Sequence, residues 1–386
     1  MLVLVILMAV ASFLLPLLHF SPNRFQSGQA IKLVDVQLLV WSIWAAYLVL
    51  LWLLAVFKPF SLVTYHAMLT YGVALVGLLA WLYLMASAAT QASIEGSAAS
   101  RVMIGSAFWC VLLLLCLIAL DAWLRMAGQR FKYSLSIVSA CVIFVIVAIW
   151  FHVGQFDDLS IIKEYHHHED RFKTAFVNHI VLVLIALVPL LVIGLPLGWL
   201  IWRYPRLNGT VFGVLNFFQT VPSIALFALL MVPLASLSNQ FPWLKTLGVS
   251  GIGAAPAIIA LILYTLLPLV RNTYTGLAEV PLSVIQASQA MGMGRWQVAW
   301  HVLIPLSLPV ILSGIRIVIV QAIGLTVVAG LIGAGGLGVF VWEGLGQYAI
   351  DLVLLGAIPT ILLAIVIDLF MQWLIAISRP AGSRVI

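Results

Sequence analysis

The chain has 386 residues, of which 64% are hydrophobic and only 8% are charged. Soluble domains carry about 25% charged residues, so this composition excludes an ordinary water-soluble protein and indicates an integral membrane protein. The formal net charge of +6 does not indicate nucleic-acid binding, because the 18 Lys and Arg residues are scattered singly between apolar runs, as the positive-inside bias of membrane proteins favours.

A membrane-spanning helix needs about 20 apolar residues, and ten stretches of the sequence meet that requirement. The first stretch follows no basic segment and precedes no small-residue cleavage site, so we interpret it as a retained span and not as a signal peptide. The predicted fold class is all-α and integral to the membrane, with about ten transmembrane helices. The predicted spans are 2–20, 36–57, 62–87, 102–124, 134–153, 177–201, 211–235, 251–270, 306–330 and 350–377.

The longest predicted outer connection, 154–176, divides the ten spans into two sets of five. We therefore predict two domains, 1–175 and 176–386. The first domain contains no motif that we can connect with a chemistry, and its role is unknown. The second domain contains all the motifs described below.

Two groups of ionisable residues precede that second domain. His166, His167 and His168 have side chains that suit a transition metal, but consecutive residues of a helix or strand do not converge on one ion. We predict a solvated loop tip there and no metal site. Asp121 and Arg125 are four residues apart, which favours a local ion pair over a proton relay.

Between the eighth and ninth predicted spans lies the segment 271–305, which is too polar to cross a membrane. Pro281 and Leu282 predict the start of a short helix, because proline is favoured in the first turn. Gly292 and Gly294 predict the end of that helix. The residues expected along one stripe of it are Val284, Ile285, Ser288 and Met291.

A second short helix is predicted from Arg295, with Trp296, Trp300 and Leu303 on one face, and Pro305 leads into the ninth span. A short amphipathic helix between two spans suits a groove of another protein. It also suits the surface of the lipid bilayer. Periodicity alone leaves both interpretations open.

The run from Gln286 to Gly292, QASQAMG, is followed by Ile304 and Pro305, and together they resemble the EAA loop of ABC importer permeases. In that family this loop is the coupling helix that docks on the ATP-hydrolysing subunit. The family's leading acid is Gln286 here, so the resemblance implies docking through a neutral hydrogen bond in place of a charge pair. The coupling residues that the resemblance implies are Gln286, Ala287, Ser288, Ala290, Gly292, Arg295 and Pro305.

Three other segments resemble permeases for quaternary-amine osmoprotectants such as glycine betaine, choline and carnitine. They are FQTVPSIALF at 218–227, LYTLLPLVRN at 263–272 and LIGAGGLG at 331–338. The resemblance covers about 175–378 and implies that the five C-terminal helices form a type I ABC importer permease (MetI-like) core. Ten spans look most like the larger glycine betaine permeases of the YehY type. Because most of these permeases have only the C-terminal half, the resemblance assigns no function to 1–175.

Glycines in this half have a physical explanation that is independent of the family. Gly333, Gly335, Gly336 and Gly338 are expected where the chain turns or packs tightly. Gly194 and Gly198 form a small-xxx-small face that suits contact between helices.

The sequence contains no phosphate-binding GxxxxGK[ST] run. We therefore expect a transport subunit that is not an enzyme and has no cofactor, with ATP bound by a separate cytosolic subunit. The resemblance also implies a second permease subunit, the same or different, and an extracytoplasmic substrate-binding protein. The residues of the substrate path are not identified. Arg316, within the ninth span, is expected to snorkel to the inner interface.

The expected location is the bacterial inner (plasma) membrane, in multi-pass form with both termini in the cytosol, because the coupling loop must face the ATPase. One alternative is an ion-coupled secondary transporter. It would require buried acids near the middle of the membrane, whereas the C-terminal spans contain only Asp351 and Asp368, both near span ends. A membrane osmosensor is the other alternative and would suit the N-terminal half.

Overall fold

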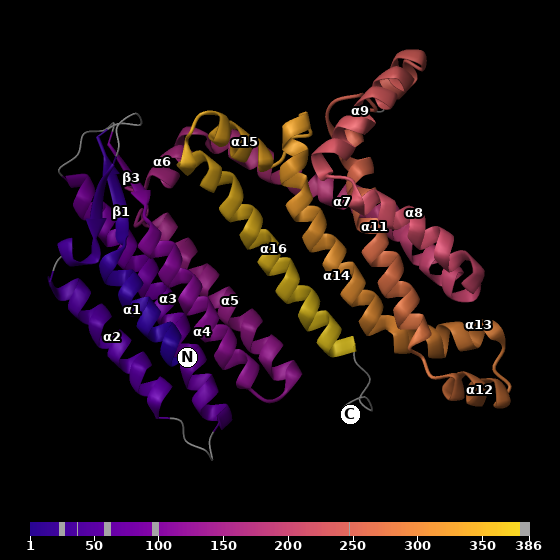
Figure 1. Cartoon of the computed structure of the whole chain (residues 1–386), viewed down its shortest axis with the longest axis horizontal. Helices are drawn as coiled ribbons and strands as arrows, with labels where there is room; N and C mark the ends of the chain where they lie inside the picture. The colour runs from indigo at the N-terminus through magenta and orange to yellow at the C-terminus, as the bar shows by residue number, and fades with distance from the viewer. Residues whose placement is uncertain (23–27, 37, 58–62, 95–99, 247, 379–386) are drawn as a thin grey trace. The chain divides into compact units, whose positions relative to one another are not determined.

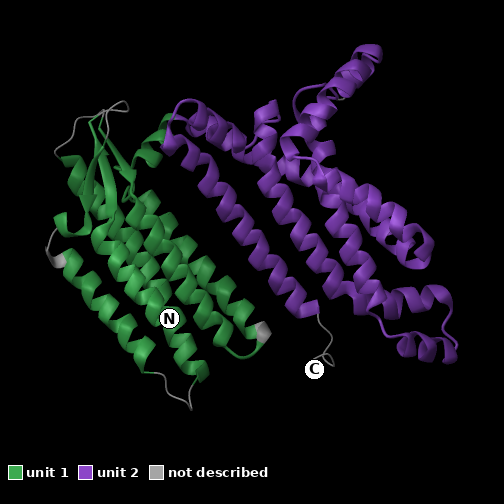
Figure 2. Cartoon of the chain, viewed as in Figure 1, with its two compact units in different colours: residues 1–167 green, residues 168–386 purple. Residues whose placement is uncertain are grey.

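The structure, a computed structural model, describes the chain apart from residues 23–27, 37, 58–62, 95–99, 247 and 379–386. The chain divides into unit 1, Met1–His167, and unit 2, His168–Ile386 (Figure 2). The domain boundary predicted between 175 and 176 falls inside helix α7 (Glu169–Arg203), because this helix begins well before its apolar run.

Unit 1 consists of apolar helices with a small sheet at one end (Figure 1). The sheet has three strands in the order β2-β1-β3, and both pairings are antiparallel. The elements in chain order are α1 (Leu2–Leu14), β1 (Pro16–Ser21), β2 (Gln29–Lys32), η1 (Leu33–Asp35), α2 (Leu38–Val56), α3 (Val63–Ile94), β3 (Arg101–Ile104), α4 (Ser106–Arg125), α5 (Gln129–His152) and α6 (Ser160–His167).

The span predicted at 2–20 is wrong beyond Leu14. Proline disfavours helical geometry in the residue before it and removes a backbone donor. Leu15 accordingly is extended, with φ −85° and ψ 152°, and Pro16 opens strand β1. Hydropathy could not reveal this change, because the strand residues Leu17 and Leu18 are as apolar as the helix and are fully buried.

The core of unit 1 is centred on two tryptophans from neighbouring helices. Trp44 on α2 and Trp81 on α3 have ring centroids 4.5 Å apart, and each side chain is at most 2% exposed. The Trp81 indole N–H donates to the carbonyl of Phe108 on α4 at 3.3 Å. The pair therefore joins three helices by aromatic contact and one hydrogen bond.

Unit 2 begins with α7 and ends with the long helix α16, and its short helices connect longer ones (Figure 1). Its elements are α7 (Glu169–Arg203), η2 (Pro205–Leu207), α8 (Asn208–Thr220), α9 (Ser223–Gln240), α10 (Trp243–Thr246), α11 (Ala254–Ala278), α12 (Leu282–Ala290), α13 (Arg295–Val298), η3 (Ala299–Leu303), α14 (Ile304–Ala329), η4 (Gly330–Ile332), α15 (Gly338–Gly346) and α16 (Ile350–Ser378).

The prediction of a single span at 211–235 is wrong, because two helices, α8 and α9, occupy this stretch and run in different directions (Figure 1). Pro222 has no N–H with which to continue α8, and Val221 before it is extended, with φ −70° and ψ 129°. The break at these two residues interrupts an otherwise apolar run.

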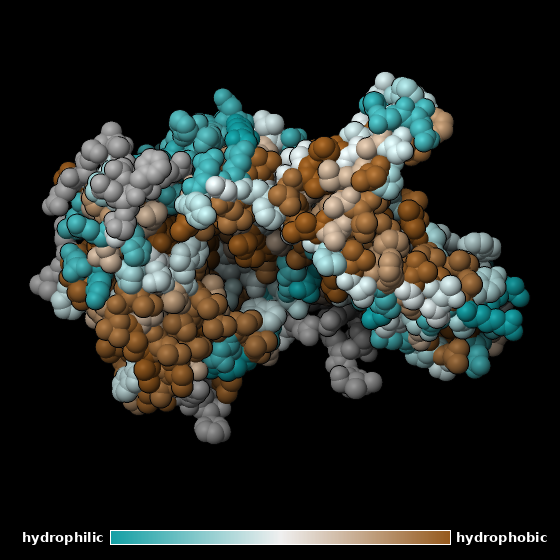
Figure 3. All heavy atoms as spheres, turned by 45° about the horizontal axis from the view of Figure 1, so that its top comes forward, coloured by the Kyte–Doolittle hydropathy of each residue, from teal (hydrophilic) through white to brown (hydrophobic). Residues whose placement is uncertain are grey.

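Eight helices in the described part of the chain are long and apolar enough to cross a membrane. Seven of them correspond to predicted spans, and the eighth, α9, overlaps the second part of 211–235; the shorter apolar helices Leu2–Leu14 and Val40–Val56 lie within the other two predicted spans. Hydrophobic side chains cover much of the face seen in Figure 3. On α5, for example, Val138, Val142 and Phe144 are each more than half exposed. Apart from the small sheet, the predicted helical membrane architecture is confirmed.

Candidate functional site

The segment predicted to contact a partner folds as two short helices between α11 and α14. Helix α12 begins at Leu282 directly after Pro281, as predicted. It ends in a tight turn at Gly292, which has φ +84°. The N–H of Gly292 donates to the carbonyl of Gln289 at 2.9 Å, and the N–H of Met293 donates to the carbonyl of Ser288 at 3.2 Å. These two bonds form a Schellman cap, which favours glycine because of the positive φ.

The second helix begins at Arg295, as predicted, and passes through the π-helical turn η3 into α14. The prediction that three large residues share one face is wrong. Trp296 and Trp300 are 75% and 63% exposed, whereas Leu303 is 6% exposed. A π turn contains more residues than an α turn, so Leu303 faces the interior.

One side of α12 holds the loop to the rest of unit 2. Ser288 is 4% exposed, and its hydroxyl donates to the carbonyl of Val284 at 2.8 Å. Ile285, on the same side, packs against a buried cluster that includes Val298 and Leu303. Along the predicted stripe, Ile285 and Ser288 face the rest of unit 2, whereas Met291 is 75% exposed.

The remaining side of the loop is open and nearly neutral. Its charge between 282 and 303 comes from Arg295 alone. Ser288 is the one predicted coupling residue that is buried. The six that are exposed are Gln286, Ala287, Ala290, Gly292, Arg295 and Pro305.

The break between α8 and α9 is tied to α11 by two side chains. The Tyr264 hydroxyl donates to the carbonyl of Val221. The Gln219 amide donates to the carbonyl of Tyr264 at 2.8 Å. At the end of α8 the Thr220 hydroxyl donates to the carbonyl of Phe217, also at 2.8 Å. Sequence analysis singled out 218–227 and 263–272 for their resemblance to a family, but it did not predict this contact between them.

The glycine-rich segment after α14 turns around a buried histidine. Gly333, Gly335 and Gly336 all have positive φ, so the predicted turn is confirmed. The fully buried His179 on α7 has Nε2 3.1 Å from the carbonyl of Ile323, and the N–H of Leu337 donates to its Nδ1 at 3.3 Å. Because a carbonyl only accepts, the ring donates from Nε2 and accepts at Nδ1.

Two glycines of α7 lie against α11, as the small-xxx-small pattern predicted. A Cβ at Gly194 would lie 2.5 Å from Leu269 Cδ2, and one at Gly198 would lie 2.6 Å from Thr273 Cβ. Any larger residue would push the two helices apart.

The prediction for Arg316 is corrected by the structure. Instead of snorkelling alone, Arg316 on α14 forms an ion pair with Asp368 on α16, at 2.5 Å and 3.1 Å. The Gln372 amide donates to the same carboxylate at 2.5 Å. The prediction missed this pair because the two charges are far apart in sequence.

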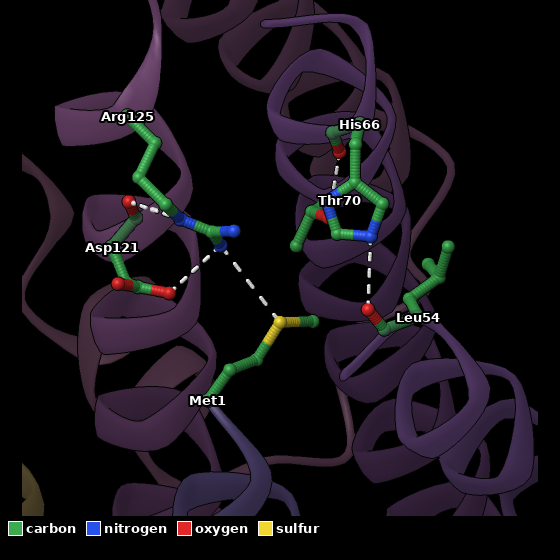
Figure 4. Close-up of polar contacts among 6 residues, drawn as sticks. All are labelled: Met1, Leu54, His66, Thr70, Asp121 and Arg125. Carbon is green, nitrogen blue, oxygen red and sulfur yellow. Dashed lines mark hydrogen bonds and ion pairs between the residues drawn. The ribbon is translucent and has the colours of Figure 1, made fainter. Parts of the chain in front are cut away.

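Figure 4 shows polar contacts of Arg125 and His66 in unit 1. Arg125 pairs with Asp121 at 2.8 Å, which confirms the predicted ion pair, and it also approaches the Met1 sulfur at 3.8 Å. His66 contacts the carbonyl of Leu54 at 2.9 Å.

The three consecutive histidines do not form the predicted loop tip, because helix α6 continues through His167. His166 lies 3.8 Å from Asp157. Within the described ranges, no group of three or more His, Cys, Asp or Glu side chains is placed to hold a metal ion.

Each of the two units matches a family of known proteins. Residues 190–377 match the family described as binding-protein-dependent transport system inner membrane component. Residues 1–162 match the N-terminal domain of ABC transporter permease YehY. A chain of a structure of the inward-facing MetNI methionine ABC transporter aligns with 54% of this chain and 97% of its own length, at 22% identity and a TM-score of 0.47.

Two relatives are named for their solutes. The glycine betaine/carnitine/choline transport system permease protein OpuCD of Bacillus subtilis is 40% identical over 210 residues, which are 54% of this chain and 85% of that protein. The osmoprotectant import permease protein OsmW of Salmonella typhimurium is 42% identical over 207 residues, which are 54% of this chain and 91% of that protein.

The fold and these relationships define a multi-pass membrane subunit that transports a solute. The chain belongs to the family of ABC importer permeases, and its homologues are osmoprotectant permeases of the glycine betaine, choline and carnitine group. Its first unit is the N-terminal domain found in permeases of the YehY type.

Proposed function

We propose that this permease subunit carries a quaternary-amine osmoprotectant, such as glycine betaine, across the bacterial inner membrane. The proposal is carried by the 40% identity to a glycine betaine/carnitine/choline permease over 85% of that protein. The family match at 190–377 contains the coupling loop and the α8–α9 break, so it includes the elements expected to move and to contact the solute.

We further propose that 282–303 docks on a separate cytosolic ATP-binding subunit, which supplies the energy. The exposed, nearly neutral side of α12 suits a largely apolar groove, and Gln286 would contribute a neutral hydrogen bond there. On the buried side, Ile285 packs against Val298 and Leu303, which lead directly into α14. Movement of the ATPase would therefore reach the membrane helices through a packed contact.

The complete transporter then requires three more components: the ATP-binding subunits, a second permease subunit and an extracytoplasmic binding protein that selects the solute. A cytosolic coupling loop also requires that both termini of this chain lie in the cytosol. Reporter fusions after Ile386 and within 160–170 test this orientation. A reporter at 165 that is active only in the cytosol would overturn it.

The experiment that tests the function is uptake of labelled glycine betaine into proteoliposomes that contain the purified complex, with binding protein outside and ATP inside. We expect uptake only when both are present. The control is the same complex with a non-hydrolysable ATP analogue.

If vesicles that contain this chain alone accumulate glycine betaine under a sodium or proton gradient, the chain is a secondary transporter and the proposal is wrong.

A further inference from the structure

We propose that the break between α8 and α9 lines the solute path, that Phe217 and Thr220 beside it contact the quaternary-amine solute, and that Tyr264 positions the break. This inference rests on the proposed function for the identity of the solute. The three residues lie on α8 and α11, and none of them belongs to the coupling loop.

The proposed orientation, with the start of α8 on the cytosolic side, puts the break at membrane depth. Helix α8 has 13 residues and rises about 1.5 Å per residue, so the break is about 20 Å from its cytosolic start. The hydrocarbon layer is about 30 Å thick. Irregular backbone at such a depth is tolerated only where it is buried in protein or lines a water-filled cavity.

The hydroxyl of Tyr264 supplies a hydrogen-bond donor to the backbone where α8 ends. Val221 ends α8 with a carbonyl that has no helical partner, and this carbonyl accepts the Tyr264 hydroxyl bond. Gln219 returns a bond to the carbonyl of Tyr264. Because Tyr264 is only 7% exposed and packs among α9 and α14 residues, it holds the break from the protein side.

The opposite side of α8 is exposed and partly polar. Gly213, Asn216, Phe217 and Thr220 are spaced three or four residues apart, which places them on one face of the helix. All four are exposed, and a Cβ at Gly213 would meet nothing within 4 Å. The Thr220 hydroxyl is bonded within the helix, but the amide of Asn216 is unfavourable against lipid tails, so this face is expected to border protein or water.

The exposed aromatic ring on this face suits the chemistry of the solute. A quaternary ammonium has no N–H to donate and is attracted to aromatic faces and to oxygen dipoles. Phe217 is 62% exposed and lies 5.7 Å from the ring of Phe218, which packs into the core. The C-terminal carbonyls of α8 add partial negative charge beside the ring. One aromatic ring gives a weak contact, which allows the solute to leave.

The test uses the full reconstituted complex, with glycine betaine uptake and binding-protein-stimulated ATP hydrolysis measured on the same vesicles. Phe217→Leu removes the aromatic ring and keeps an apolar side chain. We expect uptake to fall by about two- to fivefold, while stimulated hydrolysis is retained, so fewer solute molecules cross per ATP. Phe217→Trp keeps an aromatic ring and should retain the wild-type ratio of uptake to ATP hydrolysis. The matched control is Phe144→Leu on α5, where Phe144 is 71% exposed and no change is expected.

Two nearly isosteric variants test the other residues. Tyr264→Phe removes only the hydroxyl, and Thr220→Val replaces the hydroxyl by a methyl group. Each should lower uptake per ATP by about twofold or more, whereas a general folding defect would lower uptake and hydrolysis together. These variants decide the question if Phe217→Leu fails to assemble.

Failure of the inference differs from failure of the function. If the wild-type complex takes up glycine betaine and the Phe217, Thr220 and Tyr264 variants keep its ratio of uptake to hydrolysis, the break does not line the path. If the wild-type complex takes up no quaternary amine, the proposed solute is wrong.

Discussion

Arg316 on α14 and Asp368 on α16 meet through two hydrogen bonds, so the charged groups of two membrane helices neutralise each other within unit 2. The side chains are 33% and 27% exposed. A charge within a membrane helix is expensive unless it is paired. Together with Gln372, the pair ties α14, the helix that leaves the coupling loop, to α16.

This geometry predicts an asymmetric response to mutation. Asp368→Asn leaves the Arg316 charge without its partner and should destabilise the subunit by about 2–4 kcal/mol. Replacing both residues, as in Arg316→Gln with Asp368→Asn, removes the charge and should recover much of that loss. Thermal unfolding of the purified subunit in detergent measures both. If the double variant is no more stable than Asp368→Asn, the pair is not the source of the effect.

Substitution of Gly292 in the turn after α12 should impair coupling to ATP hydrolysis and leave the stability of the rest of the subunit nearly unchanged. Gly292→Val places a β-branched residue at φ +84°, which costs about 1–3 kcal/mol of backbone strain. Because no atom lies within 4 Å of the added Cβ, the effect arises from the backbone alone. Substrate-stimulated ATP hydrolysis and uptake should fall together.

Its control is Gly294→Ala, where φ is −70° and the nearest atom to the Cβ is 3.7 Å away. This variant should behave like the wild type. Gln286→Ala should be milder than Gly292→Val, since only a neutral hydrogen bond is lost. Full stimulated hydrolysis in Gly292→Val would show that this loop is not the coupling element.

His179 joins α7 to α14 and to the glycine-rich turn, so its loss should loosen that turn. His179→Phe keeps an aromatic ring but leaves the Ile323 carbonyl and the Leu337 N–H unpaired, at a cost of about 2–4 kcal/mol. Hydrogen exchange at 333–337 should accelerate. His152→Phe on α5, an exposed position, is the control. Unchanged exchange in the His179 variant would contradict the bridging role.

Gly198 tests the contact between α7 and α11. An added methyl group would lie 2.6 Å from Thr273 Cβ, so Gly198→Ala should destabilise the subunit by about 1–3 kcal/mol through overpacking. Gly72→Ala on α3 meets nothing within 4 Å and should be neutral or stabilising by up to about 1 kcal/mol. The shifts in unfolding temperature of the two variants should therefore have different sizes or opposite signs.

Much of this structure was predictable because apolar runs indicate membrane helices, and Pro and Gly residues indicate where helices begin and end. Pro281 and Gly292 fixed the limits of α12 correctly, since each acts through its own backbone geometry. The same local signals at Pro16 and Pro222 were outweighed by hydropathy, and there the predicted spans were wrong.

Contacts between residues far apart in the sequence could not be predicted from local sequence patterns. Arg316 and Asp368 are 52 residues apart, and neither position shows by itself that it has a partner. Trp300 and Leu303 were placed on one face because helical spacing assumes an α-helix, whereas η3 is a π-helix. Residue roles in coupling remain predictions that depend on the partner subunit.

The small sheet of unit 1 constrains the order of events during synthesis. Strand β1 pairs with β3, as in the alignment of Leu18 with Ile104, yet helices α2 and α3 separate the two strands along the chain. The sheet can therefore close only after α2 and α3 have been synthesised and the segment that follows α3 has emerged. Until then β2 is the strand available to pair with β1, so synthesis of the first three helices must precede completion of this sheet.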